Sequence, residues 1–162
     1  MPTETTEATV LISRARELYI ARKFTESRTA FRRVIDSQVD AHNTAEGFYG
    51  LAINEFSEGQ LEAAKMYFLK SLCFERTNAN CYYFLGEIAE RRDSLAEAAS
   101  YYKKATEIDV NHQGARAKLA ALLPIEHVPG DQMSADPGTK KPSARISLQM
   151  LSWLFKSDSS EA

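Results

Sequence analysis

The sequence predicts an all-α fold built from repeated pairs of short helices. The first observation is internal similarity: "FYGLAINEFSEGQLEAAKMYFLKS", residues 48–71, returns 34 positions later as "YYFLGEIAERRDSLAEAASYYKKA", residues 82–105. The second is periodicity, because apolar residues recur within each copy at intervals of three and four, the spacing of one helix face. The third is interruption: "SEGQ" and "RRDS" break each pattern after about a dozen residues, which indicates two antiparallel helices in each copy.

The composition fits a single globular domain and excludes several functional classes. Of the 162 residues, 44% are hydrophobic and 26% are charged, which is enough apolar material for a core. The 20 basic and 22 acidic residues leave a net charge of −2, too small to favour binding to nucleic acid. The start "MPTETTEATV" lacks the features of a secretory signal, and no apolar run reaches the roughly 18 residues of a membrane span. We therefore expect a cytoplasmic protein with no integral membrane segment.

Small residues and large rings recur at matched positions of the two copies. At the 34-residue step, Ala64 aligns with Ala98, and Phe68 aligns with Tyr102. The alanines allow two helix backbones to approach closely, and the rings fill the space between the helices. The pattern therefore predicts close packing of the two helices within each pair.

These residues resemble the tetratricopeptide repeat family, whose 34-residue pattern is W-x2-L-G-x2-Y, then A-x3-F, then P. Residues 79–112 match it closely through Tyr82, Leu85, Gly86, Ala98, Tyr102 and Ala105. Residues 45–78 match nearly as well, and a degenerate first copy spans 8–41. None of the three copies has the terminal proline, and Arg14 stands where the first copy should have leucine. The resemblance implies three helix pairs.

The segments around the repeats are assigned from the same register. Residues 1–7 are expected to be a disordered N-terminus, and "HNT", 42–44, forms an insertion before the second repeat. In the third repeat, Ser94 followed by Glu97 fits a capping box at the start of the second helix.

A capping helix is expected after the third repeat. In "QGARAKLAALL", 113–123, Leu119 and Ala120 occupy the Leu-Gly place of a fourth repeat, and Pro124 stops the helix. Residues 8–123 would thus form one repeat domain. The resemblance implies that this domain is a short right-handed α-solenoid of three helix pairs plus a cap, with a concave groove.

The resemblance also implies a binding groove, because in this family one face of each first helix lines the concave side. At 100° per residue, repeat positions 2, 5, 9 and 12 lie roughly 130° from the core face. We expect a groove for a protein or peptide partner lined by Ile12, Arg16, Tyr19, Glu46, Tyr49, Ile53, Phe56, Asn80, Tyr83, Glu87 and Glu90. Its middle is apolar and aromatic, which is typical of binding sites. The alternative is that Tyr49 and Ile53 pack between neighbouring repeats.

One known mode of ligand binding in the family is not expected here. Members that bind the C-terminal carboxylates of the large heat-shock chaperones carry Lys and Asn in the first repeat, Asn in the second, and Lys and Arg in the third. The corresponding residues of this chain are Ile12, Arg16, Gly50, Asn80 and Phe84. The resemblance therefore favours an apolar helix or extended peptide as the ligand rather than a charged chain end.

No catalytic, cofactor-binding or metal-binding pattern is present in the sequence. The histidines lie between or beyond the repeats, at His42, His112 and His127, without a matching nucleophile or metal ligand. Cys73 and Cys81 fit no metal spacing and are expected to be reduced structural thiols. We therefore expect a protein that is not an enzyme and that requires no cofactor or metal.

The chain changes character after Leu123. Residues 124–143 contain four of the five prolines and indicate an extended linker. Residues 144–156 form an amphipathic segment that holds the only tryptophan, and 157–162 are a polar tail expected to be disordered. We expect a helix at 144–156 that packs on the repeat domain of its own chain or of a neighbour, and its proposed anchors are Leu151, Trp153 and Leu154. Binding to a membrane surface and disorder are the alternatives.

The function expected from these features is that of a non-catalytic adaptor. Its groove would bind an apolar peptide or helix of a partner protein, and its C-terminal helix would inhibit that binding. The alternative is a chaperone for secreted or membrane-inserting client proteins, because some compact three-repeat proteins of similar length do that work.

Overall fold

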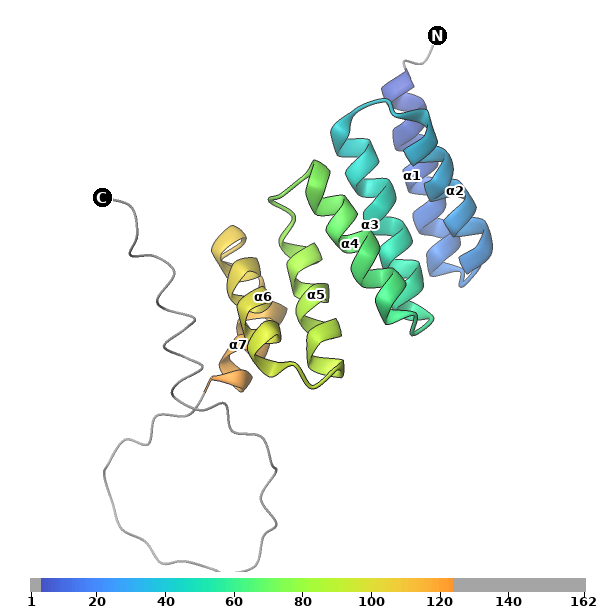
Figure 1. The fold of residues 1–162 in the computed structure, drawn as a ribbon. Helices are drawn as coiled ribbons and strands as arrows, with labels where there is room; N and C mark the ends of the chain where they lie inside the picture. The colour runs from blue at the N-terminus through green and yellow to red at the C-terminus, as the bar shows by residue number, and fades with distance from the viewer. Residues whose placement is uncertain (1–3, 124–162) are drawn as a thin grey trace, which may run out of the picture.

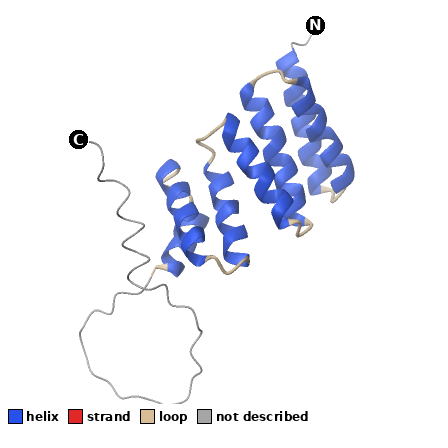
Figure 2. Cartoon of the chain, in the orientation of Figure 1, coloured by secondary structure: helices blue, strands red, loops and turns tan. Residues whose placement is uncertain are grey.

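The structure, a computed structural model, describes residues 4–123, and this part of the chain contains helices and no strand (Figures 1 and 2). The helices are α1 (Glu4–Ile20), α2 (Phe24–Ser37), α3 (Ala41–Ser57), α4 (Leu61–Phe74), α5 (Ala79–Arg91), α6 (Leu95–Ile108) and α7 (Gln113–Leu122). The turns after α3 and α5 fall on "SEGQ" and "RRDS", and the all-α prediction is confirmed. The predicted linker, the segment 144–156 and the tail 157–162 lie outside the described residues.

Successive helix pairs stack along the molecule from α1–α2 (blue) to α5–α6 and the cap α7 (orange), as Figure 1 shows. The first helices of the pairs lie next to one another, because Arg16 on α1 pairs with Glu46 on α3, and Tyr49 on α3 contacts Phe84 on α5. This two-layer stack of three helix pairs plus a cap confirms the predicted solenoid.

The start of the first helix differs from the prediction. Residues 4–7, assigned to a disordered N-terminus, are helical, since α1 begins at Glu4. Two effects account for the extra turn. Glu7 lies near the positive end of the helix dipole, and Ala8, only 1% exposed, anchors the turn in the core.

The "HNT" insertion is likewise helical rather than a loop. It adds one turn to the start of α3, which begins at Ala41. The Asp40 carboxylate accepts a hydrogen bond from the Asn43 backbone N–H at 2.7 Å, and the Thr44 hydroxyl donates to the Asp40 carbonyl at 2.8 Å. Asp40 therefore caps a helix whose first turn is the insertion itself.

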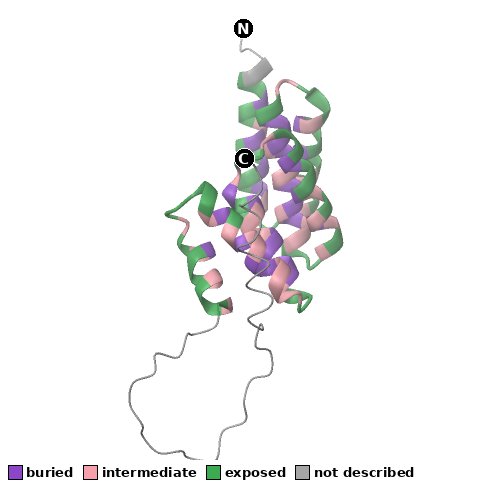
Figure 3. Cartoon of the chain, turned by 60° about the vertical axis from the view of Figure 1, so that its left-hand side comes forward, coloured by how far each residue is buried: buried purple, intermediate pink, exposed green. Residues whose placement is uncertain are grey.

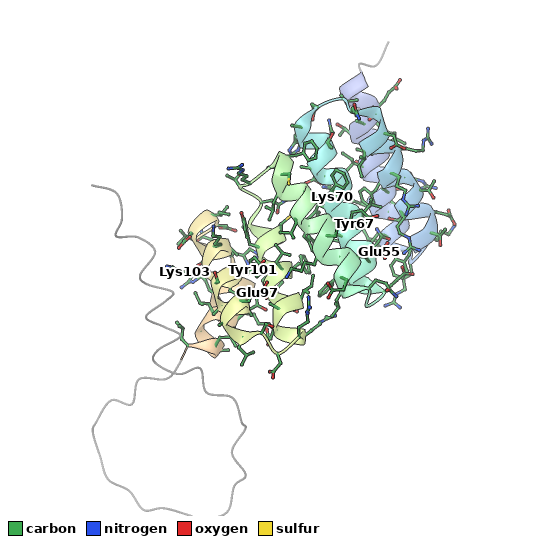
Figure 4. All side chains as sticks on the ribbon, viewed as in Figure 1. Glu55, Tyr67, Lys70, Glu97, Tyr101 and Lys103 are labelled. Carbon is green, nitrogen blue, oxygen red and sulfur yellow. The ribbon has the colours of Figure 1, made fainter. Side chains whose placement is uncertain are left out.

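The predicted capping box at the start of α6 does not form. Ser94 makes no side-chain cap hydrogen bond. Glu97 instead accepts a hydrogen bond from Lys65 on α4 at 3.0 Å (Figure 4 labels Glu97). Glu97 therefore joins α6 to α4 of the neighbouring pair, and does not cap its own helix.

The core lies between the two layers, where buried residues follow the inner sides of the helices (Figure 3). Ala64, Phe68, Ala98 and Tyr102 are all completely buried, as their matched positions predicted. The rings lie so close to the first helices that a Cβ on Gly86 would come within 2.5 Å of the Tyr102 ring. The small residues of the repeat are thus required by the rings that face them.

Buried polar side chains also join the helices of each pair. The Ser27 hydroxyl on α2 donates to the Ala15 carbonyl on α1, and the Ser71 hydroxyl on α4 donates to the Ala45 carbonyl on α3, each at 2.9 Å. Asn54 on α3 donates to the Ser27 hydroxyl at 3.1 Å and so links the first pair to the second. Because a buried donor without a partner is costly, these bonds favour one register of the stack.

The two cysteines are free thiols in different environments. Cys73 is exposed, whereas Cys81 is buried and donates to the Ser71 hydroxyl at 3.6 Å. Burial raises the pKa of Cys81 to about 12, so this thiol stays protonated at neutral pH.

Candidate functional site

A cluster of aromatic rings occupies the boundary between α3 and α5. Its centre is Phe84, whose ring centroid lies 5.2 Å from that of Phe56, 5.3 Å from that of Tyr83 and 6.5 Å from that of Tyr49. The fully buried Phe68 on α4 stacks parallel to Phe84, with ring centroids 5.4 Å apart, and supports it from the core. We call Tyr49, Phe56, Tyr83 and Phe84 the aromatic cluster; all four are partly exposed.

Tyr49 and Ile53 pack between neighbouring repeats, which is the alternative to groove lining that the sequence left open. They pack against the core cluster that joins the second and third pairs, yet each keeps part of its side chain exposed. Burial raises the pKa of the Tyr49 hydroxyl well above its ordinary value, so this group stays a hydrogen-bond donor.

A cation lies at one edge of the aromatic cluster. The guanidinium carbon of Arg91, an exposed residue near the end of α5, is 4.2 Å from the centroid of the Phe56 ring. This distance is well within the range of a cation–π interaction. The edge therefore combines an apolar ring with a positive charge that a ligand can reach.

The groove residues predicted on α1 are only partly available. Ile12 is 5% exposed and belongs to a core cluster with Phe31 and Leu51, so the prediction that it lines the groove is wrong. The reason is the close packing of α1 on α3, which covers this position. Arg16 is exposed and forms an ion pair with Glu46 of α3. Tyr19, half-buried, lies 2.8 Å from the Ser57 hydroxyl and joins α1 to the C-terminal end of α3.

The groove residues predicted on α5 are partly covered by α7. Asn80 lies 3.1 Å from Nε2 of His112, and the rings of Tyr83 and His112 stack with centroids 5.1 Å apart. Lys118 on α7 pairs with Glu87 at 2.8 Å and with Glu90 at 3.0 Å. The two glutamates therefore form a three-charge network with Lys118 rather than a free acidic patch.

This network shifts the pKa values of its members in the directions that a salt bridge requires. Burial would raise the pKa of Glu90, but the hydrogen bonds from Lys118 and Tyr102 outweigh it, and the pKa of Glu90 is lowered. The hydrogen bond to Glu87 is the largest of the causes that raise the pKa of Lys118. At neutral pH Glu90 and Lys118 are therefore charged, and their ion pair holds α7 against α5.

Replacing Lys118 by Met should lower the free energy of unfolding by about 1 kcal/mol or less, because the ion pairs are partly exposed. The folded-state pKa of Glu90 lies below its unfolded value, so this stabilisation is complete above the unfolded pKa and is lost as the pH falls through the folded one. Urea unfolding at neutral pH and below about pH 4 should therefore show a difference from wild type only at neutral pH. Lys23→Met, in an exposed pair with Glu26 on the far end of the stack, is the control. A Lys118→Met difference that persists at low pH would contradict the ion-pair explanation.

Comparison with known proteins identifies the repeat. Residues 79–112, which form α5, α6 and the turn before α7, match the family model of the tetratricopeptide repeat. These residues are therefore a tetratricopeptide repeat (TPR). The matched residues are those assigned to the third repeat from the sequence pattern. No curated protein matches the chain.

Solved structures of TPR proteins share this fold at low sequence identity. The Hsp90 co-chaperone Cns1 from Saccharomyces cerevisiae has a TM-score of 0.66 and 20% identity, and the match covers 75% of this chain and 39% of that one. The first TPR of Spaghetti (RPAP3), bound to the HSP90 peptide SRMEEVD, has a TM-score of 0.63 and 19% identity over 70% of this chain and 88% of that one. The type III secretion chaperone SycD of Yersinia enterocolitica, in complex with a peptide of the translocator YopD, has a TM-score of 0.62 and 20% identity. That match covers 74% of this chain and 93% of the SycD chain. These likenesses establish the TPR fold.

The TPR positions that would form a carboxylate clamp are occupied by packing residues here. Ile12 is buried, and Gly50 lies against Phe31, where a Cβ would come within 2.3 Å of the ring. Asn80 is bonded to His112, and Phe84 is the centre of the aromatic cluster. The fifth position holds Arg16, whose positive charge is paired with Glu46 of α3, and the other four side chains lack the positive charge that a carboxylate ligand requires.

Two residues of the TPR site were missed by the groove assignment from sequence. Arg91 lies on α5 beyond the repeat positions that were considered, and Lys118 lies on the cap. A cation directly after the last groove position, Glu90, was a usable signal for Arg91. Nothing in the local sequence could pair Lys118 with Glu87 and Glu90, because the contact depends on how α7 packs on α5.

Residues 4–123 contain neither a candidate metal site nor a helix that could span a membrane. No group of three or more His, Cys, Asp or Glu side chains in that range is placed to hold a metal ion. None of the helices described there has the length and hydropathy needed to cross a membrane.

Proposed function

We propose that the face formed by α3 and α5 binds an apolar peptide or helix of a partner protein, and that the protein is a non-catalytic adaptor. The observation that supports this most is the aromatic cluster, in which four partly exposed rings from two neighbouring helices meet around Phe84. Aromatic side chains provide large contact areas with few rotors to immobilise, and they dominate binding energies at interfaces.

The chemistry of this face favours one class of ligand. The rings are suited to apolar anchor side chains, each of which contributes about 1.5–3 kcal/mol when fully buried. The Tyr49 hydroxyl stays protonated and can donate to a peptide carbonyl, and Arg91 can pair with an acidic residue beside the anchors. The ligand that fits best is an amphipathic segment with apolar residues three and four apart and an acidic residue at one edge.

The test uses the purified full chain and fluorescein-labelled peptides in anisotropy titrations. The panel contains 14-residue amphipathic helices with Leu or Phe anchors and one acidic residue, scrambled versions of each, and the peptide SRMEEVD. At least one amphipathic peptide should bind, while its scrambled version and SRMEEVD should not. Phe56→Ala should weaken that binding about tenfold or more, since truncating an aromatic anchor typically costs over 1.4 kcal/mol.

A matched control separates loss of binding from loss of fold. Phe74→Ala removes the same side chain from α4, where Phe74 is 49% exposed and stacks on Phe48 instead of on the cluster. It should leave peptide affinity unchanged. Arg91→Ala, at an exposed position, should weaken binding of the acidic peptide without changing the thermal midpoint. Unchanged affinity in both Phe56→Ala and Arg91→Ala, or preferential binding of SRMEEVD, would contradict the proposal.

A chaperone for secreted or membrane-inserting clients is the second candidate function. What supports it is the likeness to SycD, which extends over 93% of that chain and so covers a protein of similar size. A chaperone should keep an otherwise insoluble partner in solution on co-expression, whereas the partner of an adaptor should be soluble alone. Both functions are proposed for the cytoplasm.

A further inference from the structure

Within residues 4–123, α7 is the one first helix of a pair that has no second helix of its own. The pairs α1–α2, α3–α4 and α5–α6 each bury the core face of the first helix against the second. In α5 this face includes Leu85, 1% exposed, and Ala89, 3% exposed. At the same repeat positions of α7, Leu119 is half-buried and Leu123 is 36% exposed. The corresponding face of α7 is therefore open.

An open hollow of about 670 Å³ lies along this face. It is lined by Arg116, Leu119 and Ala120 of α7 and by Leu123 directly after it, and by Thr106 of α6 and Val110 in the turn that follows, among others. Arg116, Leu119, Ala120 and Leu123 stand at repeat positions 4, 7, 8 and 11, which form the core face in the other pairs. Val110 is 70% exposed at its edge. The hollow is thus the place that the second helix of a fourth pair would fill.

We propose that residues 144–155 of the same chain bind in this hollow as an eighth helix. The segment has twelve residues, close to the 14 residues of each of α2, α4 and α6. On a helix, Arg145, Gln149 and Ser152 would share one polar face, and the large apolar residues would cover the rest.

The small residue at the centre of the hollow supports this occupant. In the third pair, Gly86 lies beneath the Tyr102 ring, and Ala120 stands 34 residues later at the same repeat position. A small residue there leaves room for a ring from the second helix, and Trp153 is the ring that the segment supplies. Leu151 and Leu154 would cover Leu119 and Leu123.

The intervening chain is long enough for this binding. Residues 124–143 number 20 and begin directly after Leu123, which itself lines the hollow. A flexible chain of that length spans roughly 25 Å, and α7 is only about 15 Å long. Such a tether holds the segment at an effective concentration near the millimolar range, so even weak binding would fill the hollow.

This placement is independent of the proposed peptide-binding face and leaves it open. The hollow is at the end of the stack beside α6 and α7, whereas the aromatic cluster is on α3 and α5. The segment would then extend the solenoid and stabilise α7, in place of the expected role as an inhibitor of groove binding.

The fluorescence of Trp153 in the full chain tests the proposal, because it is the only tryptophan. Wild type should emit at short wavelength and resist acrylamide quenching, with the same spectrum from low to high micromolar concentration. Ala120→Arg, which places a charge in the hollow, should shift the emission to that of tryptophan in water. The matched control is a pair of exposed valines: Val110→Asp should raise quenching, and Val10→Asp, at the opposite end of the stack, should not.

Three outcomes would overturn the proposal. Wild-type emission typical of water would mean that the segment is not bound at all. A protected Trp153 that is unaffected by both Ala120→Arg and Val110→Asp would place the segment elsewhere, such as on the aromatic cluster. Protection that appears only at high protein concentration would show that the hollow receives the segment of a second copy. None of these results bears on peptide binding, which Phe56→Ala tests separately.

Discussion

Phe68→Ala is expected to lower the free energy of unfolding by about 3–5 kcal/mol, the cost of truncating a fully buried ring. Phe68 is completely buried and stacks on Phe84, with ring centroids 5.4 Å apart. It also packs with Ala52 and Leu85, so it joins α4 to both α3 and α5. In a stack where each pair contacts only its neighbours, losing this ring weakens the second pair and its interface with the third.

Urea unfolding followed by helix content in far-ultraviolet circular dichroism measures this effect. Phe74→Ala on the same helix is the control, because Phe74 is 49% exposed and should lose less than about 1 kcal/mol. Equal losses in the two variants would contradict the assignment of Phe68 to the core. Because Phe68 supports Phe84, Phe68→Ala should also weaken peptide binding under conditions where the chain is still folded.

Gly86→Ala should destabilise the protein by about 1–3 kcal/mol, although alanine is the better helix former. The added Cβ would lie 2.5 Å from Cε1 and 2.7 Å from Cδ1 of Tyr102. That ring cannot move aside easily, since it is fully buried and its hydroxyl donates to Glu90 at 2.8 Å. Overpacking against a fixed ring therefore outweighs the gain of about 1 kcal/mol from helix propensity.

The same substitution at Gly114 provides the comparison. A Cβ there would meet Tyr83 at 3.2 Å, and the Tyr83 ring is half-buried, so a small shift relieves the contact. Gly114→Ala should therefore change the thermal midpoint little or raise it. If Gly86→Ala proved as harmless as Gly114→Ala, the predicted close contact between α5 and α6 would be wrong.

The pattern of side chains along the chain determined the helices and their pairing. Ala64 with Phe68 and Ala98 with Tyr102 identified the second helices, because close packing needs a small residue opposite a large one. These are local requirements that repeat every 34 residues, and all four residues are buried as predicted. The same reasoning ended α3 and α5 at their turns and predicted a capping helix at 113–123.

The groove was harder to predict because helical periodicity describes one helix at a time. It placed Ile12 on the exposed side of α1, and the packing of α1 on α3 buries it. It placed Glu87 and Glu90 in the groove, and Lys118 pairs with both of them from another helix. In each case the deciding neighbour comes from the next unit, about 30 residues away or more.

By itself, the sequence determined that this protein is a stack of TPR helix pairs, which residues form its core, and that the middle of one face is aromatic. Only the tertiary structure decided that Phe84 is the centre of that aromatic cluster, that Arg91 lies at its edge and that α7 leaves an open hollow. The physical reason is that secondary structure and core packing within a pair depend on short-range patterns. The exposure and charge of a surface depend on how neighbouring helix pairs are rotated against one another. That rotation is determined by contacts among side chains from several helices.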